Sequence, residues 1–227
     1  MTTTDEILAL AATAAGPDAT VEVTDADLAA FLAAAERGAD SEVVRALRAI
    51  RPPASPPGDP AWTAWLTAAA ATVTAGGLSR DEAPGPIHAA WLAVFAAGSA
   101  LADPAEGLSA PVAVPAAVAA GMSAAAVIES GLADWGGWSA GTVAAVVGAG
   151  VTAGLLLGLT EPRLRAAVGI CATQACGLAA AEGTPAFALE VGKAAFNGVE
   201  AALLARAGFT APDEPLDGRR GLFALFG

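Results

Sequence analysis

The pattern of apolar and polar positions predicts helices along nearly the whole chain. Apolar residues recur at helical spacing or fill whole segments, and no alternating run of Val, Ile and Thr lasts beyond a few residues. Gly, Pro or Asp stands at each boundary between these segments. The predicted helices cover residues 4–15, 24–38, 40–50, 61–75, 86–102, 115–133, 139–159, 161–181 and 186–207.

Three of the predicted helix ends carry specific signals. Thr24 followed by Asp27 predicts a capping-box-like start. In Thr160-Glu161-Pro162 we expect Thr160 to be the N-cap, with the acid and the proline in the first turn. Gly208 stands where a helix C-terminus favours a left-handed residue.

A Pro-rich stretch at residues 51–58 divides the chain into two parts. Residues 1–58 form an amphipathic N-terminal helical segment with this linker, whereas residues 59–227 are more uniformly apolar. Helices that are apolar on nearly all sides must bury one another. The sequence therefore predicts an all-α, multilayered helical bundle with its charges on the outside.

Composition supports close helix packing and a substantial core. The chain has 227 residues, of which 55% are hydrophobic and 15% charged, and small side chains dominate. Residues 140–160 carry no charge and are long enough to cross a bilayer. Their Ala, Gly, Thr and Val gain little in hydrocarbon, and no Lys/Arg cluster flanks them, so we expect a buried helix and no membrane insertion. An N-terminus without positive charge favours a cytoplasmic protein.

The charge balance disfavours several kinds of partner. There are 23 acidic and 11 basic residues, for a formal net charge of -12, so the surface repels nucleic acid and anionic lipid. Cys171 and Cys176 have no further Cys or His nearby to complete a zinc site, and two buried reduced thiols are expected. Gly148-Ala149-Gly150 lacks the strand and acidic residue of a dinucleotide fingerprint, and a P-loop is absent, so we expect no cofactor and no metal.

Few residues are candidates for chemistry. His88 is the only histidine, and without an evident partner it favours a structural role. Lys193, the only lysine, could act as a base or an anion anchor, or extend its stem over Ala into water. Trp62 and Trp65, spaced i, i+3, could line an aromatic pocket or anchor the core.

The C-terminal part of the chain resembles the helical domain of the MmgE/PrpD family. The resemblance covers residues 138–226 and weakens back to about Pro86, while residues before Pro60 match poorly. Its motifs are GAGVTAGLLLGL at 148–159, AVGICATQACGL at 167–178, GKAAFNG at 192–198 and AALLARAGFTAP at 201–212.

The resemblance implies a helical domain that in the family is joined to a smaller α+β domain. It also implies dimerisation through the helical part and cofactor-independent lyase chemistry on small di- and tricarboxylates. Because the sequence ends at Gly227, we expect the α+β domain to be lacking here.

This chain departs from the family pattern where cations are expected. Ser139 replaces a His that usually follows the aromatic residue at Trp138, and Glu190-Val191 replaces a His-Pro pair. Neutral residues take the place of a second His, at Gly107 or Leu108, and of a Lys-Arg pair, at Phe187-Ala188, and an acidic run is reduced to Asp103. A pocket without cations repels a citrate-like trianion, so the family reaction is not expected here.

Two hypotheses remain. In the first, a lyase-like protein keeps a rebuilt pocket for a less anionic small molecule. Its proposed catalytic residues are Ser139, Lys193 and Asp103, and its proposed substrate-binding residues are Trp138, His88 and Asn197. In the second, the chain is a non-catalytic helical subunit that forms a homodimer or supports a related chain, with residues 218–226 as a possible docking segment.

Overall fold

The computed structural model describes residues 1–13, 21–52, 55–74, 89–102, 112–131, 136–175 and 177–225. Within these ranges the chain is helical, with one isolated bridge between Trp138 and Leu178 and no strand, so the predicted all-α class is confirmed. The elements are α1 (Thr3–Thr13), α2 (Asp25–Gly38), α3 (Glu42–Ile50), α4 (Pro60–Thr74), α5 (Ala89–Leu101), α6 (Val114–Ser130), α7 (Ala140–Leu156), α8 (Glu161–Gln174), η2 (Ala179–Ala181), α9 (Pro185–Arg206) and η3 (Phe223–Leu225).

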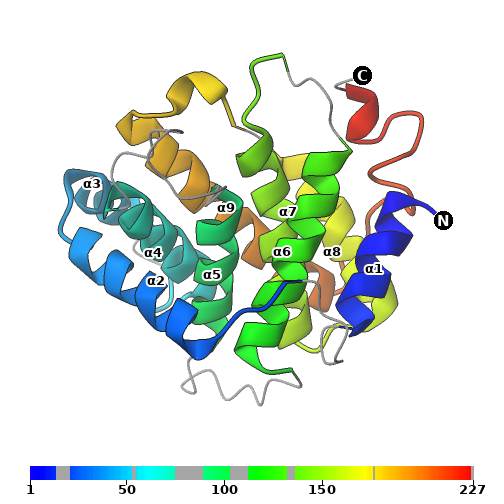
Figure 1. The fold of residues 1–227 in the computed structure, drawn as a ribbon, viewed down its shortest axis with the longest axis horizontal. Coiled ribbons are helices and arrows are strands. Elements are labelled where there is room, and N and C mark those ends of the chain that lie inside the picture. Colours follow the sequence, from blue (N-terminus) through cyan, green and yellow to red (C-terminus); the bar gives the residue numbers. More distant parts are fainter. Residues whose placement is uncertain are drawn as a thin grey trace.

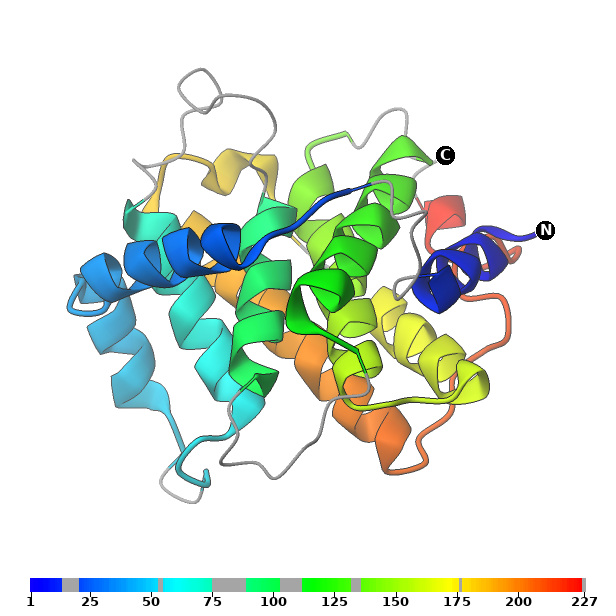
Figure 2. The same cartoon turned by 60° about the horizontal axis from the view of Figure 1, so that its bottom comes forward.

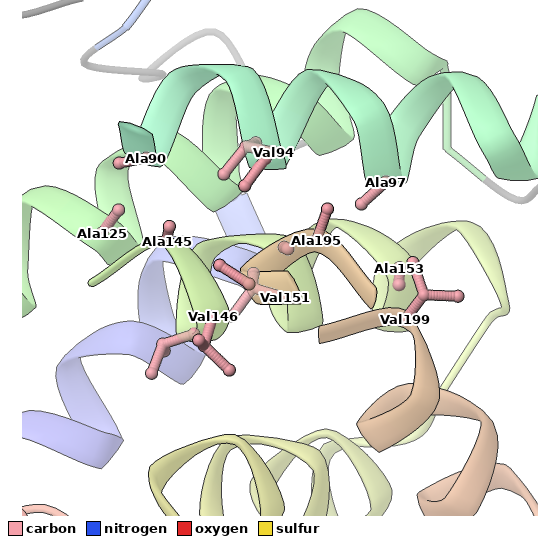
Figure 3. Packing of buried hydrophobic residues seen from close by; sticks show 14 of the residues in the cluster. Ala90, Val94, Ala97, Ala125, Ala145, Val146, Val151, Ala153, Ala195 and Val199 are labelled. Carbon is pink, nitrogen blue, oxygen red and sulfur yellow. The ribbon is translucent and has the colours of Figure 1, made fainter. Parts of the chain in front are cut away.

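Helix α7 is the centre of the bundle. It packs against α5, α6, α8 and α9, and every residue from Thr142 to Gly154 is buried (Figure 1). Figure 3 shows Val146 and Val151 of this helix among side chains that include Val94 of α5 and Val199 of α9. Burial among helices thus explains why residues 142–154, the greater part of the uncharged run at 140–160, carry no charge. Within the described ranges, no helix combines the length and the hydropathy needed to cross a membrane.

Glycines allow the central backbones to approach closely. A Cβ added to Gly121 of α6 would lie 2.0 Å from Oγ1 of Thr152 and 2.5 Å from the carbonyl oxygen of Gly148 on α7. A Cβ on Gly198 of α9 would lie 2.5 Å from the Cβ of Ala149. Because real Cβ atoms do not approach so closely, larger residues at these positions would push the helices apart.

The structure confirms two of the predicted helix ends and modifies the third. Thr24 and Asp27 form a reciprocal capping box at the start of α2. Gly208 has φ +105°, and its N–H and that of Phe209 bond back to α9 in the pattern of a Schellman motif. Thr160 is the N-cap of α8, but its side chain makes no capping hydrogen bond.

Helix α8 is shorter than predicted. It ends at Gln174, not near residue 181, and the chain then crosses the N-terminal end of α7. Gly177 has φ +143° and lies so close to α7 that a Cβ would be 1.8 Å from Oγ1 of Thr142. The apolar pattern of 161–181 continues through this crossing because the segment is partly buried, which hides the helix end in the sequence.

The first three helices cover two different parts of the bundle. Helix α1 packs on α6 and α8, whereas α2 and α3 pack on α4 (Figure 2). Thr3 of α1 donates from both its N–H and its hydroxyl to the carboxylate of Asp217, at 2.6 and 2.7 Å. The N-terminal helix is thereby tied to the C-terminal segment. The division of the chain at residue 58 stays a prediction.

Candidate functional site

Ser139 and Trp138 lie at the N-terminal end of α7. Ser139 is the N-cap and is only 5% exposed. Its backbone N–H donates to the carbonyl oxygen of Gly177 at 3.1 Å, and its own carbonyl oxygen accepts the hydroxyl of Thr142 at 3.0 Å. Trp138 is 41% exposed, because it faces outward beside Leu178.

Glu190 of α9 contacts the same region through the segment that follows α8. Its carboxylate oxygens accept the backbone N–H of Leu178 at 3.1 and 3.2 Å. Burial raises the pKa of Glu190 above its usual value, the hydrogen bond from Leu178 opposes this rise, and the nearby charge of Glu182 adds to it. An acid near the N-terminal end of α7 is therefore held in place by backbone contacts.

We call this group of residues the α7 N-terminal site. It consists of Trp138, Ser139, Gly177, Leu178 and Glu190. The family resemblance implied histidines at the positions of Ser139 and Glu190. The fold brings these two positions together, because Ser139 bonds to Gly177 and Glu190 bonds to the next residue, Leu178. Among the proposed site residues the sequence prediction omitted Glu190, although its place before Gly192 in the family pattern was the signal that could have identified it.

Lys193 lies against aromatic rings of α4 and α9. Its ammonium is 3.8 Å from the ring centroid of Phe196 and 5.1 Å from that of Trp65. Trp65 stacks on Trp62, with ring centroids 4.8 Å apart, and both rings meet the edge of Phe196. The amine therefore makes cation–π contacts with both rings. These rings form a packed cluster between α4 and α9, as expected for core anchors.

Asn197, His88 and Asp103 complete the predicted set. Asn197 is 4% exposed, and its Nδ2 donates to the carbonyl oxygen of Gln174 at 3.2 Å, which links the end of α8 to α9. Its Oδ1 has no hydrogen-bond partner. His88 and Asp103 lie outside the described residues.

The described cysteine is buried and is not suited to nucleophilic chemistry. Burial raises the pKa of the Cys171 thiol to about 12, so it stays protonated near neutral pH. Cys176 lies outside the described residues. In the part of the chain that the structure describes, no three His, Cys, Asp or Glu side chains are placed to share a metal ion.

Two cavities lie away from the α7 N-terminal site. One, of about 380 Å³, is lined by α1, the end of α7 and the start of α8. The other, of about 320 Å³, lies between α8 and the segment 212–225. Neither cavity is lined by Ser139 or Lys193.

The fold of the described residues is an all-α bundle around an apolar central helix. Residues 127–227, which include α7, α8 and α9, match the MmgE/PrpD N-terminal domain. Through this region the chain is similar to the MmgE/PrpD family.

The chain is also similar in sequence to curated proteins. The chain is 35% identical over 146 residues to a cis-aconitate decarboxylase of Aspergillus terreus and to one from strain NIH 2624 / FGSC A1156 of that organism. Each match covers 61% of this chain and 30% of the relative. The chain thus spans about a third of the length of these relatives.

Proposed function

We propose that this protein is an MmgE/PrpD lyase-like protein with a rebuilt small-molecule pocket that does not act on citrate-like tricarboxylates. The observation that carries the proposal is Glu190, a carboxylate bound to the N–H of Leu178 where the family resemblance implied a histidine. Elimination or decarboxylation of a polyanion needs cationic or hydrogen-bonding anchors for its carboxylates. An acidic group at this place repels such a substrate.

A less anionic ligand fits the α7 N-terminal site better. Trp138 offers an exposed aromatic face, and Glu190 has a raised pKa that favours proton exchange with a bound molecule. We propose Ser139 and Lys193 as further catalytic residues and Asn197 as a binding residue, with Asp103 and His88 contributing from segments outside the described residues. The chemistry remains cofactor-independent in this proposal.

The second candidate is a non-catalytic helical subunit. Glu190 and the backbone N–H of Ser139 both form hydrogen bonds to the 177–178 segment. These groups therefore have a structural role, which favours a non-catalytic protein. Trp138 and Leu178 are 41% and 55% exposed, which suits contact with a second copy or a related chain. In both candidates the protein is expected in the cytoplasm, without nucleic acid or membrane as a partner.

Calorimetric titration tests the electrostatic argument common to both candidates. The purified protein is titrated with cis-aconitate and with the trimethyl ester of the same acid, at low and high salt. We expect no saturable binding of the trianion under either condition. Tight, saturable binding of cis-aconitate would contradict the proposal.

Site variants then separate the two candidates. If a neutral analogue is turned over, Ser139→Ala and Lys193→Met are expected to abolish turnover while the fold remains intact by circular dichroism. If no analogue is turned over and the protein forms a defined dimer or a complex with a related chain, the subunit candidate is supported. Glu6→Gln, an exposed change on α1, is the matched control in both assays.

A further inference from the structure

The 380 Å³ cavity lies where the N-terminal helix covers the family-related bundle. Helix α1 forms one wall, and the end of α7 with the start of α8 forms the other. Figure 2 shows α1 lying beside α8, at the side of the molecule where the C-terminal segment also runs. No residue of the α7 N-terminal site lines this cavity, so the two sites are separate.

The interior of the cavity is apolar. Its larger lining side chains are Leu8 from α1, Leu155 from α7, Leu159 from the turn after α7, and Leu164 from α8. Leu8 and Leu164 are buried, while Leu155 and Leu159 are partly exposed. The volume lies within the range of small-molecule sites, and a wall of leucines selects an alkyl or aryl group.

The cavity also carries three charged side chains. Nη2 of Arg165 donates to Oδ1 of Asp5 at 2.9 Å and to Oε1 of Glu161 at 3.4 Å. Oδ2 of Asp5 accepts the backbone N–H of Thr2, so each oxygen of this carboxylate accepts a hydrogen bond. The Glu161 side chain is 70% exposed and makes only the longer contact. One guanidinium faces two carboxylates, which leaves an excess negative charge beside an apolar cavity.

We propose that this cavity binds a small amphipathic cation, a primary alkylammonium of about four to eight carbons, with the ammonium paired to Glu161 and the alkyl chain against the leucines. The amide dipoles at the start of α8 oppose a cation, but they amount to about half an elementary charge and act only within the first turn. The formal net charge of -12 adds to the attraction. A carboxylate of the same length would meet two carboxylates and a guanidinium that is already paired.

The experiment compares n-octylammonium with octanoate, below their micelle concentrations, by titration of the full chain carrying labelled Leu methyl groups. We expect octylammonium to bind at least fivefold more tightly than octanoate and to shift the methyl signals of Leu8, Leu155, Leu159 and Leu164. From butyl to octyl, affinity should rise about fourfold for each added methylene that the cavity buries. Equal or tighter binding of octanoate, or shifts confined to other leucines, would overturn the proposal.

A pair of charge variants tests the partner of the ammonium. Glu161→Gln is expected to weaken octylammonium binding about two- to fivefold, the range for an exposed ion pair, and to leave octanoate no weaker. Glu6→Gln removes an exposed charge of α1 that does not line the cavity, and it should leave both affinities unchanged. An unchanged affinity for octylammonium in Glu161→Gln would refute the assignment of Glu161.

Discussion

The carboxylate of Glu190 on α9 accepts the backbone N–H of Leu178 at 3.1 and 3.2 Å, and so ties the segment after α8 to the helix that follows it. This one contact places an acid beside Ser139, since the neighbouring Gly177 accepts the N–H of Ser139. The same carboxylate therefore holds the 177–178 segment and supplies the negative charge of the α7 N-terminal site.

Removing this carboxylate should loosen the segment at 177–178. We expect Glu190→Ala to lower the free energy of unfolding by about 1–2 kcal/mol, because a backbone N–H loses a charged acceptor. Glu190→Gln keeps an acceptor oxygen and should restore most of this loss. Urea denaturation measures both, with the exposed Glu182→Ala as control, and equal stabilities of Glu190→Ala and the parent protein would contradict the structural role.

The close approach of α7 and α9 at Gly198 should not tolerate a side chain. A Cβ there would lie 2.5 Å from the Cβ of Ala149 and 2.7 Å from the backbone nitrogen of Gly150. We expect Gly198→Ala to destabilise the protein by about 1–3 kcal/mol, although Ala favours helix more than Gly does.

A change on the same helix provides the control for Gly198. Glu200→Ala removes a partly exposed side chain two residues away and should alter stability by about 0.5 kcal/mol or less. Thermal and urea unfolding measure both variants. A Gly198→Ala protein as stable as the parent would mean that the two helices do not meet as closely as described.

Most helices could be predicted because their ends carry local signals. The capping box at Thr24 and the glycine at 208 depend on neighbouring residues only, so the sequence contains them in full. The end of α8 depends instead on a contact between Gly177 and Thr142, which are 35 positions apart. An apolar pattern reports burial and not backbone direction, and for this reason the helix was predicted too long.

The site was predictable to a smaller extent. Ser139 was proposed from a family position, and the structure places it beside Glu190, which was not proposed. For Lys193, two chemical roles and a solvated structural role were left open. Its position over Phe196 and Trp65 depends on how α4 packs on α9, and no local pattern contains that information.

The ammonium of Lys193 should contribute to stability through the aromatic cluster. Lys193→Met keeps the length and apolar stem but removes the charge over the rings of Phe196 and Trp65. We expect a loss of about 0.5–2 kcal/mol in the free energy of unfolding and a shift in tryptophan emission. Lys193→Arg keeps a cation and should recover part of both. If Lys193→Met changes neither quantity, the cation–π contact does not operate in solution.

The attachment of α1 should depend on pH through Asp5. Hydrogen bonds from the Thr2 backbone and from Arg165 lower the pKa of Asp5 from 3.8 to about 2. A carboxylate with a lowered folded-state pKa stabilises the fold above its unfolded value, and this stabilisation is lost as the pH falls from about 4 through about 2. We therefore expect Asp5→Asn to be less stable than the parent at pH 7, with the difference shrinking between pH 4 and pH 2. Urea unfolding at a series of pH values measures this difference, and Glu6→Gln on the same helix should show a smaller one. A difference between parent and Asp5→Asn that stays constant down to pH 2 would show that the Asp5–Arg165 pair does not hold α1 to α8.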